Sequence, residues 1–164
     1  AAALAQRAGL SLSEVAAGLA GFANIKGRLQ IKTGLQGATI LDDTYNANPD
    51  SMKAALDVLA HLPAPRIFVM GDIGELGEDE SPAMHAEVGS YAREKGIEQA
   101  YFVGDFSASA AEAFGEQGLW FADKDPLIQV LCHELPPQAN VLVKGSRFMK
   151  MEQVVEALTA SSSV

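Results

Sequence analysis

The sequence predicts an α/β fold, because short apolar runs alternate with longer helical segments along most of the chain. The runs are nearly unbroken by polar residues, which is typical of strands that are buried on both faces of a parallel sheet. Right-handed crossovers between such strands place helices on both faces of one sheet. We therefore expect a Rossmann-like open, mainly parallel sheet with helices on both faces and an N-terminal β-hairpin.

The N-terminal segment, residues 1–22, predicts two short helices rather than strands. Ser11 to Glu14 has a capping-box pattern, and Gly21 follows as a stop signal. The chain opens in helical periodicity and without an initiator methionine. We interpret it as a fragment of a longer protein, against which this helical segment packs.

A half-buried β-hairpin is predicted next. Residues 28–32 alternate polar and apolar side chains with a period of two, as a strand with one exposed face does. Gly34 and Gly37 then bracket a turn into the apolar residues 38–41. The two strands are therefore expected to pair antiparallel.

The rest of the chain alternates strand, loop and helix. Asn48 and Pro49 predict the start of the first helix, as its N-cap and first-turn residue. The predicted strands are residues 67–70, 100–103, 119–121 and 141–143. The predicted helices are residues 49–61, 81–95, 107–115, 124–133 and 148–159.

Composition and charge exclude several classes of function. The 164 residues are 48% hydrophobic and 20% charged, as in a globular protein, and no apolar run approaches the ~20 residues of a membrane-spanning helix. The net charge of −9 argues against nucleic-acid or anionic-membrane binding. The single Cys132 lies in an apolar pattern, so we expect a buried thiol and a reducing, cytoplasmic location.

The most informative segment is the polar loop at residues 41–52, between a strand and a helix. Ligands of open α/β sheets bind just beyond the carboxyl ends of strands. In one interpretation Asp43 accepts from sugar hydroxyls and Tyr45 supplies a stacking face. The amides of Asn46 and Asn48 would then read a base edge. In the other, these residues are turn formers and helix caps, as Asp and Asn often are.

A second polar loop, residues 71–80, also follows a strand directly. Its glycines permit close approach of the backbone, and acids such as Asp72 and Glu75 can hold an ammonium group. Its G-x-x-G-x-x-G spacing is not a dinucleotide fingerprint. The alternative interpretation is a solvated acidic loop.

A third strand exit, residues 143–150, carries Lys144, Ser146 and Arg147. Hydroxyl and cationic donors there can hold a carboxylate or a phosphate. The alternative is a helix start with surface cations. We expect this exit to meet the other two loops at the same edge of the sheet.

No metal site and no phosphate loop are predicted. His61, His85 and His133 are scattered, without an H-E-x-x-H pattern or a cysteine partner. The sequence also lacks G-x-S-x-G and G-x-x-x-x-G-K-[ST]. If the chain binds ATP, the residues that hold the triphosphate lie outside this sequence, so we expect no complete catalytic site within it.

Together the loops resemble the Mur ligases of bacterial cell-wall synthesis. The likeness rests on Lys26-Gly27-Arg28-Leu29, on the Asp-Asp-Thr-Tyr-Asn-Ala-Asn-Pro-Asp-Ser-Met string at residues 42–52, and on residues 143–152. Gly71-Asp72, Glu75-Leu76-Gly77 and His85 fit the family's step that adds D-alanyl-D-alanine. The resemblance implies that residues 1–25 end the family's central, ATP-binding domain and that residues 26–164 form its C-terminal domain.

The resemblance also implies an activity and its site. It implies an ATP- and Mg²⁺-dependent ligase that joins D-alanyl-D-alanine to UDP-N-acetylmuramoyl-tripeptide through an acyl phosphate. It implies nucleotide contacts by Arg28, Asp43, Tyr45, Asn46 and Asn48. It implies acceptor contacts by Asp72, Glu75, Lys144, Ser146 and Arg147. The phosphate loop, the Mg²⁺ ligands and the UDP-sugar pocket belong to the other domains of the family, so we expect this chain to be inactive alone.

Two alternatives stay open. The first is another ligase of the superfamily, such as a folylpolyglutamate synthase. Asn48 before Pro49 argues against other Mur steps, which more often carry a histidine before the proline. The second is a non-catalytic Rossmann-like nucleotide-binding module, which the missing initiator and the N-terminal helices disfavour.

Overall fold

The computed structural model describes residues 27–160, so the helices expected within residues 1–22 lie outside the described part of the chain. The strands are β1 (Gln30–Thr33), β2 (Thr39–Asp43), β3 (Arg66–Gly71), β4 (Gln99–Val103), β5 (Gly118–Phe121) and β6 (Asn140–Lys144). The α-helices are α3 (Pro49–Ala60), α4 (Ser81–Glu94), α5 (Ser107–Phe114), α6 (Lys124–Glu134) and α7 (Glu152–Thr159). Short 3₁₀ turns lie at η1 (Leu35–Gly37) and η2 (Arg147–Met149).

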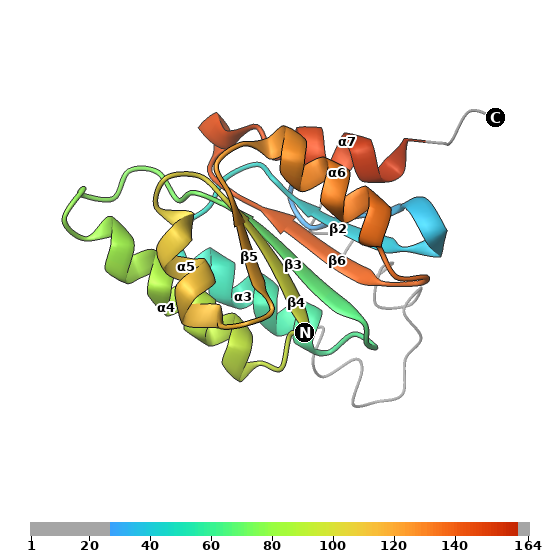
Figure 1. The fold of residues 1–164 in the computed structure, drawn as a ribbon, viewed down its shortest axis with the longest axis horizontal. Coiled ribbons are helices and arrows are strands. Elements are labelled where there is room, and N and C mark those ends of the chain that lie inside the picture. Colours follow the sequence, from blue (N-terminus) through green and yellow to red (C-terminus); the bar gives the residue numbers. More distant parts are fainter. Residues whose placement is uncertain (1–26, 161–164) are drawn as a thin grey trace.

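One six-stranded sheet runs through the molecule in the order β1-β2-β6-β3-β4-β5 (Figure 1). β1 pairs antiparallel with β2, whereas all other neighbouring strands pair in parallel. This confirms the predicted sheet and its N-terminal hairpin. The chain moves outward from β2 through β3 and β4 to β5, and then returns to place β6 between β2 and β3.

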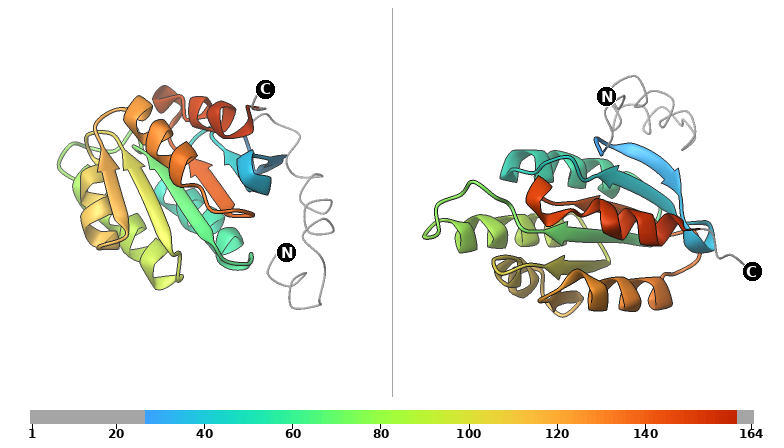
Figure 2. Two further views of the ribbon diagram at one scale, coloured as in Figure 1. Left: turned by 45° about the vertical axis from the view of Figure 1, so that its right-hand side comes forward. Right: turned by 90° about the horizontal axis from the view of Figure 1, so that it is seen from above.

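The direction of these moves decides which face of the sheet each helix covers. Right-handed crossovers put the connections of the outward moves on one face and the connection of the return move on the other. Accordingly, α3, α4 and α5 pack on one face and α6 and α7 on the other (Figures 1 and 2). Strand side chains alternate between two cores: Phe68 and Met70 belong to the first, and Ile67 and Val69 to the second.

The last predicted helix, residues 148–159, is shorter and divided. η2 ends at Met149. The next residue, Lys150, has a left-handed backbone with φ of 50° that cannot continue a right-handed helix, and α7 begins after Met151. Met151 is fully buried. A Cβ atom at Gly71 or at Gly145 would come within 2.7 Å of its side chain, so any larger residue at either strand exit would displace Met151.

Two expectations from composition can be compared with the structure: the burial of Cys132 and the lack of a membrane-spanning helix. Cys132 of α6 is half-buried rather than buried, and its sulfur lies 4.0 Å from the Ala157 carbonyl of α7. Burial raises the pKa of this thiol, which disfavours the thiolate and suits a structural role. Within residues 27–160, no helix is long and apolar enough to span a membrane.

Candidate functional site

The three polar loops leave three adjacent strands of the sheet. β6 lies between β2 and β3, with Lys144 in register with Asp43 on one side and with Met70 on the other. The strand order also reverses here, which is where open α/β sheets place their ligands. The expected convergence of the three loops at one sheet edge is therefore what the structure shows.

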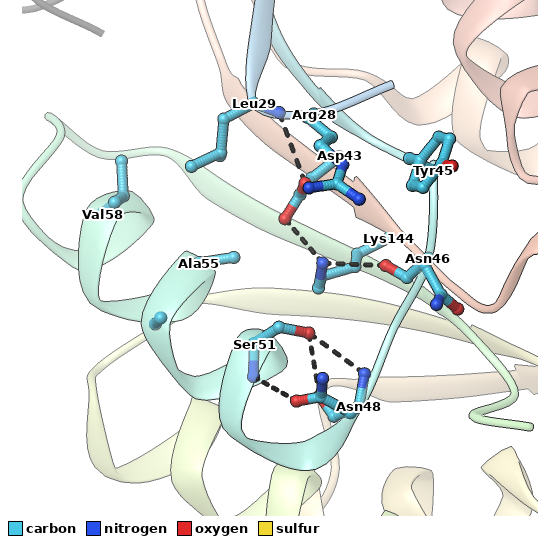
Figure 3. Close-up of a pocket in the computed structure, with 11 residues that line it drawn as sticks. Arg28, Leu29, Asp43, Tyr45, Asn46, Asn48, Ser51, Ala55, Val58 and Lys144 are labelled. Atoms are coloured by element: carbon cyan, nitrogen blue, oxygen red, sulfur yellow. Dashed lines mark hydrogen bonds and ion pairs between the residues drawn. The ribbon is translucent and has the colours of Figure 1, made fainter. Parts of the chain in front are cut away.

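A buried ion pair joins two of the strand exits. The Lys144 ammonium lies 2.7 Å from Oδ2 of Asp43 and 3.0 Å from the Asn46 carbonyl oxygen (Figure 3). The two side chains are only 4% and 12% exposed. Oδ1 of Asp43 accepts from the Leu29 amide at 3.3 Å. A buried lysine of this kind requires its partner, so Lys144 fixes where the Asp43 carboxylate lies.

The neighbouring Asp42 faces the opposite side of β2, because successive side chains of a strand alternate. Its carboxylate accepts from the Lys32 ammonium at 2.8 Å and from the Thr44 hydroxyl at 2.6 Å. The two adjacent aspartates therefore have separate lysine partners, and only Asp43 points to the side that carries α3.

A pocket of about 440 Å³ opens between the β2 exit and α3; we call it the β2–α3 pocket (Figure 3). Its lining residues are Arg28, Leu29, Asp43, Tyr45, Asn46, Asn48, Ser51, Ala54, Ala55, Val58 and Lys144. Ser51, Ala55 and Val58 have the spacing of one helical face and form its α3 wall. We did not predict this wall from the sequence, although the small side chains at that spacing were a signal for it.

Two arginines lie close to the ring of Tyr45. The guanidinium carbons of Arg28 and Arg147 lie 4.4 Å and 5.2 Å from the centroid of its ring. The Tyr45 amide donates to the Gly27 carbonyl at 2.7 Å. Gly27 has a φ of 79°, and a Cβ atom there would lie 2.9 Å from the Tyr45 nitrogen. The face that we expected to stack on a base therefore carries an arginine.

Asn48 caps α3 as predicted. Its Oδ1 accepts from the Ser51 amide at 2.8 Å, and the Ser51 hydroxyl accepts from the Asn48 amide at 3.0 Å. This reciprocal pair is a capping box. Both interpretations of Asn48 are therefore compatible, because it caps the helix and also lines the pocket.

A second pocket of about 360 Å³, the β3–β6 pocket, lies between the other two strand exits. It is lined by Tyr45, Asn46, Gly74, Glu75, Ser146, Arg147 and Phe148. The Ser146 hydroxyl accepts from the Gly74 amide at 2.6 Å and ties the two loops together. Phe148 is 64% exposed, an unusual state for a large apolar side chain; we did not predict it as a site residue.

The structure therefore sorts the predicted residues into two adjacent pockets. The five residues expected at a nucleotide all line the β2–α3 pocket, and Glu75, Ser146 and Arg147 line the β3–β6 pocket. Lys144, expected with the second group, lines the β2–α3 pocket instead. Tyr45 and Asn46 line both pockets, so the two sites share a wall.

Asp72 is not among the residues that line either pocket. Its Oδ1 accepts from the Ser107 amide at 2.8 Å and from the Ser107 hydroxyl at 2.6 Å, and its Oδ2 accepts from the Phe106 amide at 3.2 Å. The carboxylate thus binds the N-terminus of α5, where negative charge is stabilising. Its expected contact with an acceptor stays a prediction.

The fold and the paired pockets at the strand exits define a Rossmann-like ligand-binding domain. A family description, "Mur ligase, glutamate ligase domain", matches residues 27–147. The chain belongs to the Mur ligase family. It is 44% identical over 160 residues to the UDP-N-acetylmuramoyl-tripeptide–D-alanyl-D-alanine ligase of Escherichia coli K12, covering 96% of this chain and 35% of that protein.

Further relatives and solved structures are also similar to this chain. The ligase of the same name from Mycobacterium tuberculosis H37Rv is 35% identical over 99% of this chain and 37% of its own length. MurF from Acinetobacter baumannii superposes with a TM-score of 0.74 at 35% identity, over 94% of this chain and 35% of that one. MurF from Thermotoga maritima, solved with ADP, has the same fold at a TM-score of 0.73 and 23% identity, over 94% and 35% of the two chains. The chain thus spans about a third of the length of these proteins.

Proposed function

We propose that this chain is part of a cytoplasmic, ATP-dependent ligase that joins D-alanyl-D-alanine to UDP-N-acetylmuramoyl-tripeptide in peptidoglycan synthesis. Residues 26–164 would be its C-terminal domain and residues 1–25 the end of its central domain. Relatives of that name, 35% to 44% identical over nearly the whole of this chain, support the proposal. The observation that carries it is the pair of pockets that share Tyr45 and Asn46, each suited to one substrate.

The β2–α3 pocket suits the nucleoside end of ATP. A carboxylate at a strand exit accepts hydrogen bonds from ribose hydroxyls, and Asp43 is held in place for this by Lys144. Ala55 and Val58 offer an apolar wall to a base. Because Oδ1 of Asn48 serves the helix cap, its NH₂ group is the part of the side chain that would donate to the base. Lys144 would thus act on the nucleotide side, as a positioning residue, rather than on the acceptor.

The β3–β6 pocket suits a small zwitterion. Glu75 supplies a negative charge and Arg147 a positive charge around the same space. D-alanyl-D-alanine carries an ammonium group at one end and a carboxylate at the other, so its charges complement the pocket. An arginine can bind the carboxylate with two hydrogen bonds. The Ser146 hydroxyl would orient the dipeptide between them.

The proposed reaction has two steps. A carboxylate oxygen of the donor attacks the γ-phosphorus of ATP, which gives an acyl phosphate and ADP. The dipeptide amine then attacks the acyl carbon and loses a proton, and phosphate leaves as the carbon–oxygen bond breaks. The shared wall at Tyr45 and Asn46 would keep nucleotide and dipeptide side by side for this transfer.

Mg²⁺, when bound, would neutralise charge on the ATP phosphates. Within residues 27–160, no group of three or more His, Cys, Asp or Glu side chains lies together to hold a metal. The carboxylates at the β2 exit are already engaged, Asp42 by Lys32 and Asp43 by Lys144. We therefore propose that the Mg²⁺ ligands, like the phosphate loop, lie on another domain.

The alternative activities have weaker support. A folylpolyglutamate synthase from Yersinia pestis shares the fold at a TM-score of 0.60, but at 20% identity the likeness concerns the fold alone. A non-catalytic nucleotide-binding module would not explain the second pocket with its opposed charges.

Phosphate release by the full-length ligase tests the proposal. Release should require ATP, the UDP-muramoyl-tripeptide and D-alanyl-D-alanine together, and omission of any one should abolish it. Equal release with glutamate and a folate as substrates would contradict the proposal and favour the folylpolyglutamate alternative.

A further inference from the structure

His85 of α4 is fully buried directly behind the loop that leads into the β3–β6 pocket. Its Nδ1 lies 2.6 Å from the Ser81 carbonyl oxygen, one helical turn earlier. Its Nε2 lies 2.9 Å from the Ile73 amide, which donates to it. Nε2 is therefore the nitrogen that accepts from the loop backbone, and Nδ1 is the nitrogen that faces the helix carbonyl.

The two residues just before Glu75 are each held by a side chain from another element. His85 of α4 accepts the Ile73 amide, and Ser146 of the β6 exit accepts the Gly74 amide. Glu75 itself has a left-handed φ of 62°, a conformation that costs free energy for any residue other than glycine. Because the two amides immediately before Glu75 are fixed, its strained backbone is held in one conformation and its side chain leaves the loop in one direction.

The support behind His85 is rigid. α4 packs so closely on α5 that a Cβ atom at Gly89 would lie 2.1 Å from the Ala110 carbonyl oxygen. Asp72 binds the N-terminus of α5, and its Oδ1 lies 3.8 Å from Nε2 of His85. The α4–α5 pair is thus connected to both residues that follow β3, Asp72 and Ile73.

We propose that His85 is a positioning residue for the acceptor dipeptide. By accepting the Ile73 amide, it fixes the backbone that carries Glu75 at the rim of the β3–β6 pocket. This inference rests on the proposed function, in which that pocket binds D-alanyl-D-alanine. It assigns His85 no contact with the substrate and no proton transfer.

Two amide substitutions of similar polarity test the inference in the full-length ligase. Gln at position 85 can place its side-chain oxygen near the position of Nε2, whereas the shorter Asn reaches only the position of Nδ1. His85→Asn should raise the KM for D-alanyl-D-alanine about tenfold, as expected when a buried amide loses its acceptor, and His85→Gln should restore most of the wild-type value. The KM for ATP should change by less than about twofold in both variants, because the β2–α3 pocket does not depend on Ile73.

His61 provides a matched control. Its Nδ1 also lies 2.6 Å from the carbonyl oxygen one turn earlier, that of Asp57, but it is at the end of α3, away from the loop. His61→Asn should leave both KM values unchanged. Hydrogen exchange of the segment containing residues 73–75 should accelerate in His85→Asn and stay slow in His85→Gln and His61→Asn.

Several outcomes would overturn the inference. Equal KM values for the dipeptide in the Asn and Gln variants would do so, as would a parallel rise in the KM for ATP, which indicates a general loss of structure. Unchanged hydrogen exchange in His85→Asn would also overturn it. If the wild-type enzyme failed to use D-alanyl-D-alanine, the proposed function would fall, and the exchange data would still decide whether His85 holds the loop.

Discussion

The two adjacent aspartates of β2 have different roles: one faces a ligand pocket and the other contributes only to the structure. Asp43 faces the β2–α3 pocket and pairs with Lys144, whereas Asp42 faces away and pairs with Lys32. In the full-length ligase, Asp43→Ala should raise the KM for ATP by about tenfold or more, and the KM for the dipeptide much less, because a ribose acceptor is lost and Lys144 is released. Asp42→Ala, the control, removes a paired carboxylate without touching the pocket. An effect of Asp43→Ala confined to the dipeptide would contradict the assignment.

Glu75 can be tested against a neighbour in the same loop. Glu75 lines the β3–β6 pocket, whereas the exposed Glu78 is not among its lining residues. Glu75→Gln should raise the KM for D-alanyl-D-alanine about fivefold to fiftyfold, because a charged hydrogen bond to the ammonium group is lost. Glu78→Gln should leave that KM unchanged. Steady-state kinetics that give the same result for both variants would place the ammonium site elsewhere.

Sequence reasoning at the scale of residues named most of the polar side chains that line the two pockets, but not the pairing among them. Lys144 lies 101 positions from Asp43, and nothing local shows that the two side chains meet. Asp72 likewise resembled a ligand residue, although its partner Ser107 follows 35 positions later. Such partners are set by the order of strands in the sheet, which no local pattern encodes.

At the scale of elements, the apolar runs predicted the strands. β3, β4 and β6 are buried on both faces, as such runs indicate, whereas the edge strand β5 leaves Leu119 and Trp120 38% and 46% exposed. β2, however, extends through Asp43, since a polar residue with a buried partner is compatible with a strand. The break before α7 was missed because Lys150 adopts its left-handed conformation without being glycine. The order that puts β6 beside β2 could not be predicted, because an apolar run does not specify its neighbour.

The N-terminus of α3 offers a test of an element that serves both stability and binding. Asn48→Ala removes a capping box and should lower the free energy of unfolding by about 1 kcal/mol in urea denaturation. Asp123 at the start of α6 makes no capping hydrogen bond through its side chain. Asp123→Ala should therefore change stability by less than about 0.5 kcal/mol. Equal losses in the two variants would mean that the capping box contributes nothing specific.

At the scale of the whole molecule, the proposed function places only part of an enzyme's site on this chain. The chain carries a net charge of −9 and lacks a G-x-x-x-x-G-K-[ST] loop. Near the β2–α3 pocket, Lys144 is already paired with Asp43, and Arg28 lies over Tyr45. Of the two cations that line this pocket, Lys144 is thus neutralised, and the nucleoside end of ATP is the part that we propose the pocket binds. A second domain that carries the phosphate loop would complete the site on closure and exclude water from the acyl phosphate.

This division of the site predicts how the chain behaves alone. Isothermal titration with ATP should show a dissociation constant above about 1 mM, because the phosphates, which supply much of the binding energy, lack their partners. Addition of the UDP-muramoyl-tripeptide and D-alanyl-D-alanine should produce no ADP. The full-length ligase under the same conditions is the control, and it should bind ATP more tightly and turn over. Production of ADP by the isolated chain would show that it holds a complete phosphoryl-transfer site, and the proposal of a site split between domains would then be wrong.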